Sequence, residues 1–200
     1  GAAIGWGQNF YGQCHVDPPP PGETIVALAA GVYHTAALAS DGEVRCRGYD
    51  NYGQCTVPAL PAGLVYVEIA AGFGHSLARR SDGSVIAWGN NAYGQGNVPA
   101  LPAGTTYVEV DCGDDHSVVR RSDGVVLAFG ENSFGQCNVP ALLPGLKFVE
   151  LACGGNHTLA VVQVLTDWVA ENKWAPPGVE QWGFVENLAA FLQGQTAMTI

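Results

Sequence analysis

Apolar and polar positions follow one pattern that recurs along most of the chain. In its clearest copy, the apolar segment Val65 to Ala71 is followed by a Gly-x-x-His turn and a second segment, Ser76 to Ser81. The pair Asp82-Gly83 then leads into a third segment, Ser84 to Trp88. Asp-Gly between two such segments is typical of a tight β-hairpin. The pattern therefore predicts three or four short antiparallel strands in each copy.

The copies of this pattern are spaced by a constant 41 residues, without insertion or deletion. A fixed period of this size is typical of repeat folds. A unit of three or four strands cannot bury both of its faces alone, so we expect the units to stack around an axis as propeller blades. We therefore predict an all-β fold, a β-propeller of about four blades. The repeated positions include His34, His75, His116 and His157, and the pairs Gly53-Gln54, Gly94-Gln95 and Gly135-Gln136.

The repeat region covers residues 1–162, and its first copy, Ile4 to Gln13, is only a half. Two arrangements are compatible with this length. The blades either close into a small ring, or form an open arc whose free edges are covered by the tail or by another chain. The half copy leaves room for a closing blade shared by the two ends of the region, which slightly favours the ring.

These residues resemble the repeats of the regulator of chromosome condensation family, in a compact variant with a shorter period. The resemblance is carried by Ala71 to Ala78, Ser81 to Gly83 and Trp88 to Gln95, and it extends from residue 4 to about residue 162. It implies a β-propeller in which the repeated histidines are structural, although the family generally uses seven blades. WD-repeat propellers have a similar period but end a blade in Trp-Asp, where this chain has Trp-Gly or Phe-Gly, so we reject that family.

Composition and charge exclude several classes of partner. The chain has 8 Lys and Arg against 18 Asp and Glu, a net charge of −10, so its field repels phosphate backbones and nucleic acid is not an expected partner. Every apolar run is broken well before the roughly 20 residues that a membrane-spanning helix needs. The chain begins at Gly1 rather than Met, which is compatible with removal of a signal or transit peptide or of a larger upstream region. The compartment stays open, and an organelle lumen or stroma is compatible with it.

Four histidines in one phase would aim four imidazoles at the axis of a closed ring, which raises a metal site as an alternative. We favour the structural role, in which each histidine begins a strand and bonds to neighbouring backbone. Asp114-Asp115 beside His116 is the one acidic cluster with a protic neighbour, and we interpret it as a solvated loop tip rather than a cation site. No cysteine has a histidine and an acid at recurrent spacing, and we predict no catalytic residue, cofactor or metal.

The six cysteines fall in three phases of the repeat. Cys14, Cys55 and Cys137 share one phase, Cys112 and Cys153 share another, and Cys46 stands alone. Residues in the same phase of adjacent blades are normally too far apart for a disulfide. We therefore expect small buried thiols, with a bridge between Cys112 and Cys153 left open for a small ring.

Half of the basic residues lie in two equivalent pairs, which form a candidate basic patch on an acidic body. Salt bridges to acidic neighbours are the favoured explanation and a docking patch is the alternative. The residues are Arg79, Arg80, Arg120 and Arg121.

The repeat stops after Val162, and residues 163–200 form an aromatic-rich extension. We predict a partly helical segment, with one helix from Asp167 to Lys173 and a second from Val179 to Gln193. Large apolar side chains at this density need a surface to bury against. The extension either seals an open edge of its own propeller or docks onto a partner. The docking candidates are Trp168, Trp174, Trp182, Phe184, Val185, Leu188, Phe191 and Leu192.

The function that explains both parts is a non-catalytic scaffold that binds other proteins, as an accessory or peripheral subunit of a larger assembly. An organellar membrane complex such as a photosystem is one setting that fits. The resemblance also implies an alternative, a regulator of a small GTPase similar to a guanine-nucleotide exchange factor, or the substrate-recognition module of a ubiquitin ligase. The contact residues of the exchange factor do not match positions in this chain, and a ligase domain is absent from it.

Overall fold

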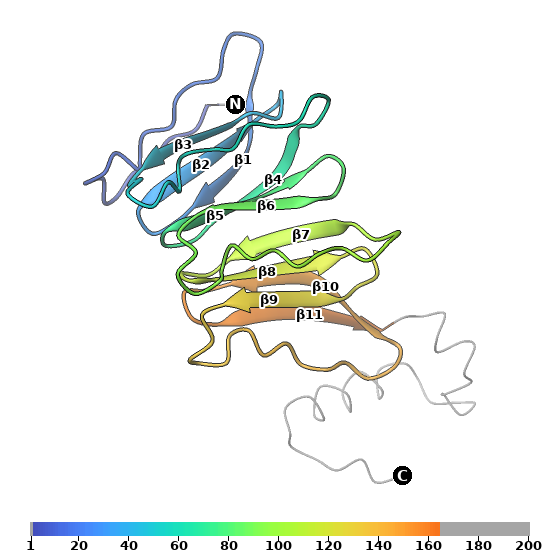
Figure 1. Cartoon of the computed structure of the whole chain (residues 1–200). Coiled ribbons are helices and arrows are strands. Elements are labelled where there is room, and N and C mark those ends of the chain that lie inside the picture. Colours follow the sequence, from blue (N-terminus) through green and yellow to red (C-terminus); the bar gives the residue numbers. More distant parts are fainter. Residues whose placement is uncertain (1, 165–200) are drawn as a thin grey trace, which may run out of the picture. The chain divides into compact units, whose positions relative to one another are not determined.

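The computed structural model describes residues 2–164. All regular elements of this part are β-strands, as predicted, and they form separate antiparallel sheets that correspond to the copies of the repeat. Three sheets have three strands and the fourth has two (Figure 1). The blades are β1 (Ile25–Ala30), β2 (His34–Ala39) and β3 (Val44–Gly48); β4 (Tyr66–Ala71), β5 (His75–Arg80) and β6 (Val85–Gly89); β7 (Tyr107–Cys112), β8 (His116–Arg121) and β9 (Val126–Gly130); and β10 (Leu146–Cys153) with β11 (Thr158–Val164).

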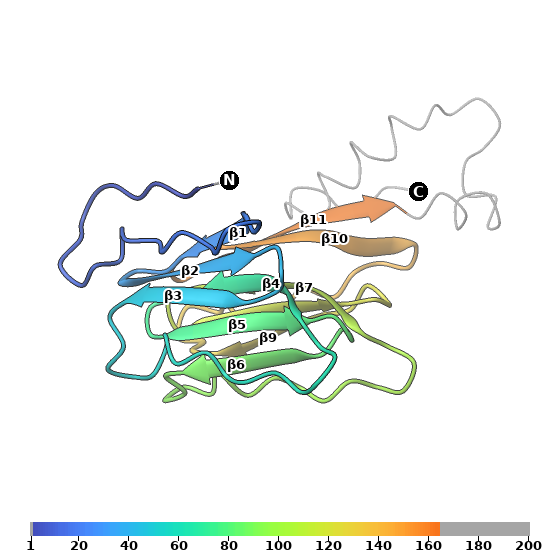
Figure 2. The same ribbon diagram turned by 90° about the horizontal axis from the view of Figure 1, so that it is seen from above.

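Each blade is built from local sequence signals. Figure 2 shows the strand order β4-β5-β6 across the second blade. The turn between β5 and β6 is closed by Asp82-Gly83, where Gly83 adopts φ +79° and the Arg80 N–H donates to the Ser84 carbonyl at 2.8 Å. A positive φ is readily adopted by glycine, which explains why Gly follows Asp in this turn. The Asp82 carboxylate accepts from the Ser84 N–H at 2.9 Å and completes the turn.

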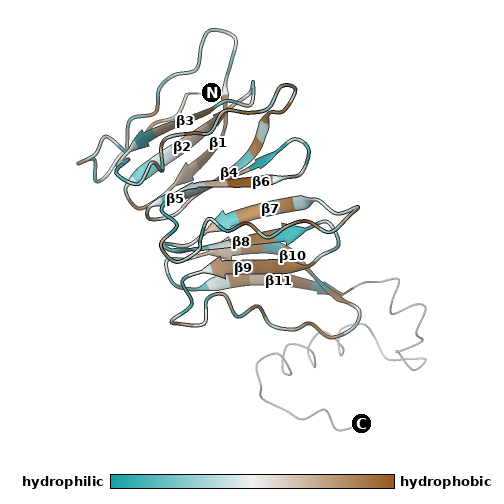
Figure 3. Cartoon of the chain, viewed as in Figure 1, coloured by the Kyte–Doolittle hydropathy of each residue, from teal (hydrophilic) through white to brown (hydrophobic). Residues whose placement is uncertain are grey.

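The hydrophobic core is divided into clusters that lie between successive blades. Between the second and third blades, Leu77 packs with Tyr107, Val110 and Val119. Equivalent clusters join the first blade to the second around Leu38, and the third to the fourth around residues 118 and 151. Each blade is therefore stabilised by its neighbours rather than by an internal core, as expected for a stacked repeat. Figure 3 shows that β9 and β11 are apolar over most of their length.

Backbone hydrogen bonds link the blades in sequence order. Val32 N–H donates to the Gly72 carbonyl at 3.2 Å, and Phe73 N–H to the Asp114 carbonyl at 2.9 Å. Asp114 N–H in turn donates to the Gly155 carbonyl at 2.9 Å. Among residues 2–164, no equivalent bond joins the fourth blade to the first. The described part therefore holds three complete blades and a two-stranded fourth, with a free face at each end of the series.

The structure corrects the expectation of thiols at two cysteines. Cys46, on β3, forms a disulfide with Cys55, in the loop that follows, with their Cα atoms 5.0 Å apart. The loop after β3 folds back beside its own strand, so cysteines from two different phases meet within one copy. Within the described residues the remaining cysteines are free thiols, which are Cys14, Cys112, Cys137 and Cys153.

The chain divides into two compact units, and the propeller blades belong to the first of them, which contains residues 1–142 and 147–163. The second contains residues 143–146 and 164–200. The predicted helices, from Asp167 to Lys173 and from Val179 to Gln193, and all the proposed docking residues of the extension lie outside the described residues. Within the described part no helix is long and apolar enough to cross a bilayer.

Candidate interaction surface

Two loops lie side by side at one end of every complete blade. In the second blade, these are the turn between β4 and β5 and the loop after β6. His75 opposes Gly89 in the strand register, and the Asn90 N–H donates to the Gly74 carbonyl at 2.7 Å. The Gly-x-x-His turns and Gly-Gln loops of successive blades therefore form one surface, which we call the loop face. It consists of residues 8–13, 31–33, 49–54, 72–74, 90–95, 113–115 and 131–136.

Buried histidines beneath the loop face form hydrogen bonds between successive blades. His75 Nε2 lies 2.9 Å from the Ser117 hydroxyl of the next blade, and that hydroxyl donates to the Gln95 carbonyl at 2.7 Å. A serine hydroxyl has one proton, so Ser117 accepts from His75, whose Nε2 carries the hydrogen. The same contact crosses the other interfaces, from His34 to Ser76 at 2.8 Å and from His116 to Thr158 at 2.9 Å.

These histidines are buried and neutral at pH 7. Burial lowers the pKa of His34 and His75 to about 4, and it also lowers the pKa of His116. Each of these histidines joins its blade to the next through a hydrogen bond, which is a structural role. Within residues 2–164, no three His, Cys, Asp or Glu side chains are arranged to hold a metal ion. His157 is exposed, unlike its three equivalents, because no further blade covers it in the described part.

Buried glutamines shape the loops that carry the exposed aromatic residues. The Gln54 carbonyl oxygen Oε1 accepts from the Tyr52 N–H at 3.0 Å, and Gln95 accepts in the same way from Tyr93 at 2.9 Å. Each glutamine thus turns its loop tightly and leaves the aromatic residue two positions earlier at the surface. The aromatic residues presented in this way are Tyr11, Tyr52, Tyr93 and Phe134.

At the first and second blades, the aromatic rings of the loop face touch one another. Tyr11 lies edge-on to Tyr33 and Tyr49, with ring centroids 5.5 and 4.9 Å apart. Tyr33 continues the contact to Phe73 at 5.3 Å, and Tyr49 continues it to Tyr52 at 5.9 Å. We call these five residues the aromatic patch. Clustered aromatic rings with polar hydroxyls at the surface are the composition that protein interfaces favour.

At the third blade the loop face becomes acidic. Asp114 and Asp115 occupy the turn between β7 and β8, and Glu131 follows β9 in the adjacent loop. Partial burial raises the pKa of Asp115, and the neighbouring charges of Asp114 and Glu131 raise it further. Two hydrogen bonds from Ser133 lower the pKa of Glu131. This acidic patch gives the loop face an aromatic end and a negatively charged end.

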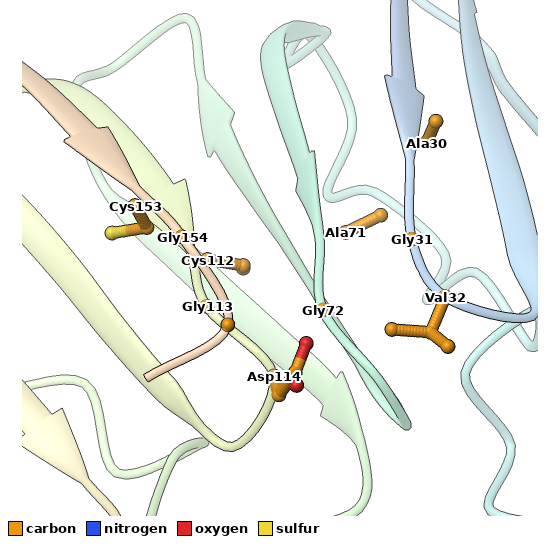
Figure 4. Close-up of a pocket in the computed structure, with 11 residues that line it drawn as sticks. Ala30, Gly31, Val32, Ala71, Gly72, Cys112, Gly113, Asp114, Cys153 and Gly154 are labelled. Atoms are coloured by element: carbon orange, nitrogen blue, oxygen red, sulfur yellow. The ribbon is translucent and has the colours of Figure 1, made fainter. Parts of the chain in front are cut away.

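A shallow groove of about 240 Å³ runs past the innermost strands, between the blades. Figure 4 shows that its wall is built from small residues, among them Gly72 and Gly113 from successive Gly-x-x-His turns. Cys112 and Cys153 also line it, and burial raises the pKa of both thiols, that of Cys153 to about 12. Neither cysteine is a thiolate at neutral pH, so neither is an activated nucleophile.

The four arginines of the candidate basic patch lie at the ends of β5 and β8. Arg79 pairs with Glu68 at 2.7 Å, and Arg120 pairs with Glu109 at 2.6 Å. Each of these glutamates also accepts a backbone N–H from the next blade, as Glu109 does from Leu151 at 2.8 Å. The ion pairs therefore belong to the contacts between blades. Arg80 lies beside Arg79, and Arg121 pairs with Asp123.

The aromatic patch was not identified from the sequence. Part of its signal is present there, since an aromatic residue precedes every repeated Gly-Gln pair, as Tyr52 precedes Gly53-Gln54. The other members, such as Tyr33 and Tyr49, sit in two different loops of the first blade. Their contact depends on the register that places the end of β3 beside the start of β2.

Comparison with known proteins agrees with this architecture. Residues 25–54, 66–95 and 107–136 match the family described as regulator of chromosome condensation (RCC1) repeat. In fold, the chain is similar to Prp20p from Saccharomyces cerevisiae, with 24% identity and a TM-score of 0.66, over 79% of this chain and 50% of that one. It is also similar to human WBSCR16, with 21% identity and a TM-score of 0.61, over 78% of this chain and 53% of that one.

A third similar structure is the ectodomain of the receptor kinase CR4 from Physcomitrella patens, with 24% identity and a TM-score of 0.59, over 80% of this chain and 46% of that one. This chain therefore spans about half the length of the structures it matches. No curated protein matches it in sequence.

The stacked blades and the displayed loops define the chain as a β-propeller repeat protein that serves as an interaction module. It carries three repeats of the regulator of chromosome condensation (RCC1) type. The resemblance inferred from the Gly-x-x-His and Gly-Gln positions is thereby confirmed.

Proposed function

We propose that this chain is a non-catalytic scaffold, an accessory or peripheral subunit of a larger protein assembly, which binds a partner protein through the loop face. The aromatic patch is the observation that carries this proposal. Tyr residues dominate the affinity of many protein interfaces because they bury a large rigid ring and keep a hydroxyl for hydrogen bonding. Tyr11 and Tyr52 are both exposed at the edges of the patch.

The composition of the loop face indicates the chemistry of the partner. Its acidic end, around Asp114 and Glu131, favours a partner with Lys or Arg side chains beside an apolar centre, which would also be attracted by the net charge of −10. Proteins of similar fold bind other proteins, since Prp20p is described with binding properties to Gsp1p and histones, and in complex with Kap60. An organellar membrane complex such as a photosystem is one setting for such a subunit.

The test is capture of partners from a native extract by the full chain and by a variant, Tyr52→Ser with Tyr93→Ser. Both tyrosines are exposed, so the blades should remain folded, as circular dichroism would verify. Loss of one interfacial tyrosine typically weakens binding by about tenfold, which is about 1.4 kcal/mol. The matched control is Val125→Ser, an exposed apolar residue at the opposite, hairpin end of a blade.

A partner that is retained by the wild type and the control but lost by the tyrosine variant supports the proposal. An unchanged set of captured proteins would place the binding surface elsewhere. A nucleotide-exchange assay on small GTPases addresses the alternative function, because clear stimulation of exchange would show a regulator rather than a scaffold alone.

A further inference from the structure

Equivalent residues at the blade interfaces are buried everywhere except at the two ends of the series. On the first strand of each blade, one apolar residue faces the preceding blade. Ile69, Val110 and Leu151 hold this position in the second, third and fourth blades, and they are 9%, 5% and 7% exposed. Leu28 holds it in the first blade and is 55% exposed. The outer face of β1 therefore has the character of an interface that no other blade covers in the described part.

The opposite end shows the matching half of the same contact. On the second strand of each blade, one residue faces the following blade, and Ala36, Leu77 and Val118 hold this position with at most 1% exposure. Each packs in the same cluster as the first-strand residue of its neighbour, as Leu77 does with Val110. Leu159 is the equivalent in the fourth blade and is 64% exposed. Leu159 and Leu28 thus hold the two positions that pack against each other at every internal interface.

The polar contacts between blades are divided between the two ends in the same way. Every internal interface joins a histidine to a Ser or Thr hydroxyl 42 residues later, as His116 does to Thr158. The remaining histidine of the series is His157, exposed on the fourth blade, and the remaining hydroxyl is Thr35 on the first. Glu109 accepts the Leu151 N–H across an internal interface. The equivalent glutamate on the fourth blade is Glu150. Leu28 of the first blade is equivalent to Leu151, so the N–H of Leu28 is the group that Glu150 would accept from in the same type of contact.

The strand content of the fourth blade and the segment before the first blade also complement each other. In the described part the fourth blade has two strands, whereas each of the other blades has three. The segment Ile4 to Gly7 has the sequence that ends a third strand, Trp-Gly, but it precedes the first blade. Trp6 is 85% exposed, whereas its equivalent Trp88 is partly buried and donates to the Gln54 carbonyl at 2.8 Å. A groove of about 320 Å³ lies between this segment and the outer face of β1.

We propose that two copies of this chain associate head to tail, with the β10–β11 hairpin of one copy packed against the outer face of β1 in the next. The segment Ile4 to Gly7 of the second copy then lies beside β11 as a third strand of the fourth blade of the first. By the register of the complete blades, His157 opposes Gly7, as His75 opposes Gly89. The sequence of residues 165–200 contains no histidine and no Asp-Gly pair, so it does not continue the pattern of the blades.

Such a contact is heterologous, because two different surfaces meet, and this property supplies the test. The mass of the full chain is 20.9 kDa and is measured by light scattering over a wide range of protein concentration. We expect assembly of the wild type, and at least about tenfold weaker assembly, or about 1.4 kcal/mol, in Leu28→Glu and in Leu159→Glu. Both residues are exposed, so both variants should stay folded. Val125→Glu, on an exposed hairpin end, is the control with the same charge change and should assemble like the wild type.

The decisive sample is an equimolar mixture of Leu28→Glu and Leu159→Glu. Each variant keeps the surface that the other has lost, so the mixture should form a species of twice the mass of one chain, although neither variant does so alone. A wild type that stays monomeric at every concentration would overturn the proposal, and so would assembly that survives either substitution. A mixture that stays monomeric would show that any wild-type dimer pairs the same surface on both copies, which also contradicts the head-to-tail arrangement.

Discussion

Leu77 and Leu159 occupy the same place in two copies of the repeat, but only Leu77 is covered by a following blade. Leu77 is fully buried against Val110 and Val119, whereas Leu159 is 64% exposed. Replacement of Leu77 by Ala leaves a cavity between two blades that are held together by that cluster. Buried Leu→Ala changes cost about 2–5 kcal/mol, while changes at exposed positions stay within about 0.5 kcal/mol. The same substitution should therefore lower the free energy of unfolding much more in Leu77→Ala than in Leu159→Ala.

The measurement is urea unfolding of both variants and of the wild type, at protein concentrations low enough for the chain to be monomeric. A loss of about 3 kcal/mol in a domain of this size corresponds to a fall in Tm of about 6–12 °C. Leu159→Ala serves as the control for any effect of Ala itself on strand propensity. Equal losses in the two variants would refute the reasoning, because they would show that the fourth blade is covered as completely as the second.

Two further predictions concern the histidine turns. The folded pKa of His34 and His75 is about 4, below the usual 6.5, so the unfolded chain takes up these protons first. The free energy of unfolding should thus fall as the pH drops from about 6.5 towards about 4, by up to about 1.4 kcal/mol per pH unit for each histidine. Urea unfolding measures this trend. A free energy of unfolding that does not change between about pH 6.5 and 5 would contradict it. Gly72→Ala should lower the stability more than Gly63→Ala does, because a Cβ at Gly72 would overlap the His75 imidazole and the Gly113 carbonyl. At Gly63 a Cβ would meet open space, and only the positive φ is unfavourable. Thermal unfolding compares the two variants.

The strands were predictable because their signals are local and repeated. The segment expected from Ser76 to Ser81 is β5, His75–Arg80, and the segment expected from Ser84 to Trp88 is β6, Val85–Gly89. Alternation along each strand and glycine in the turns determine these boundaries within one residue. The repeated histidines begin β2, β5 and β8, where the sequence placed them.

The disulfide and the aromatic patch were not predictable in the same way, because both depend on how one loop folds. Cys46 and Cys55 belong to different phases of the repeat, so comparison of equivalent positions does not bring them together. The loop after β3 turns back because the Gln54 side chain accepts from the Tyr52 N–H. In the same loop the Cys55 N–H donates to the Asp50 carboxylate at 2.6 Å, Cys55 lies beside Cys46, and Tyr52 is exposed.

The two ends of the blade series differ from its middle in energy as well as in exposure. In a stack of repeats, stability is close to a sum of terms for each unit and each interface between neighbours. Within residues 2–164, the second and third blades have two interfaces each, while the first and fourth have one, and the fourth has two strands instead of three. The ends should therefore open first in local unfolding. A head-to-tail contact would add one interface term to the two least stable blades, so it would suppress local opening at the two ends of the series.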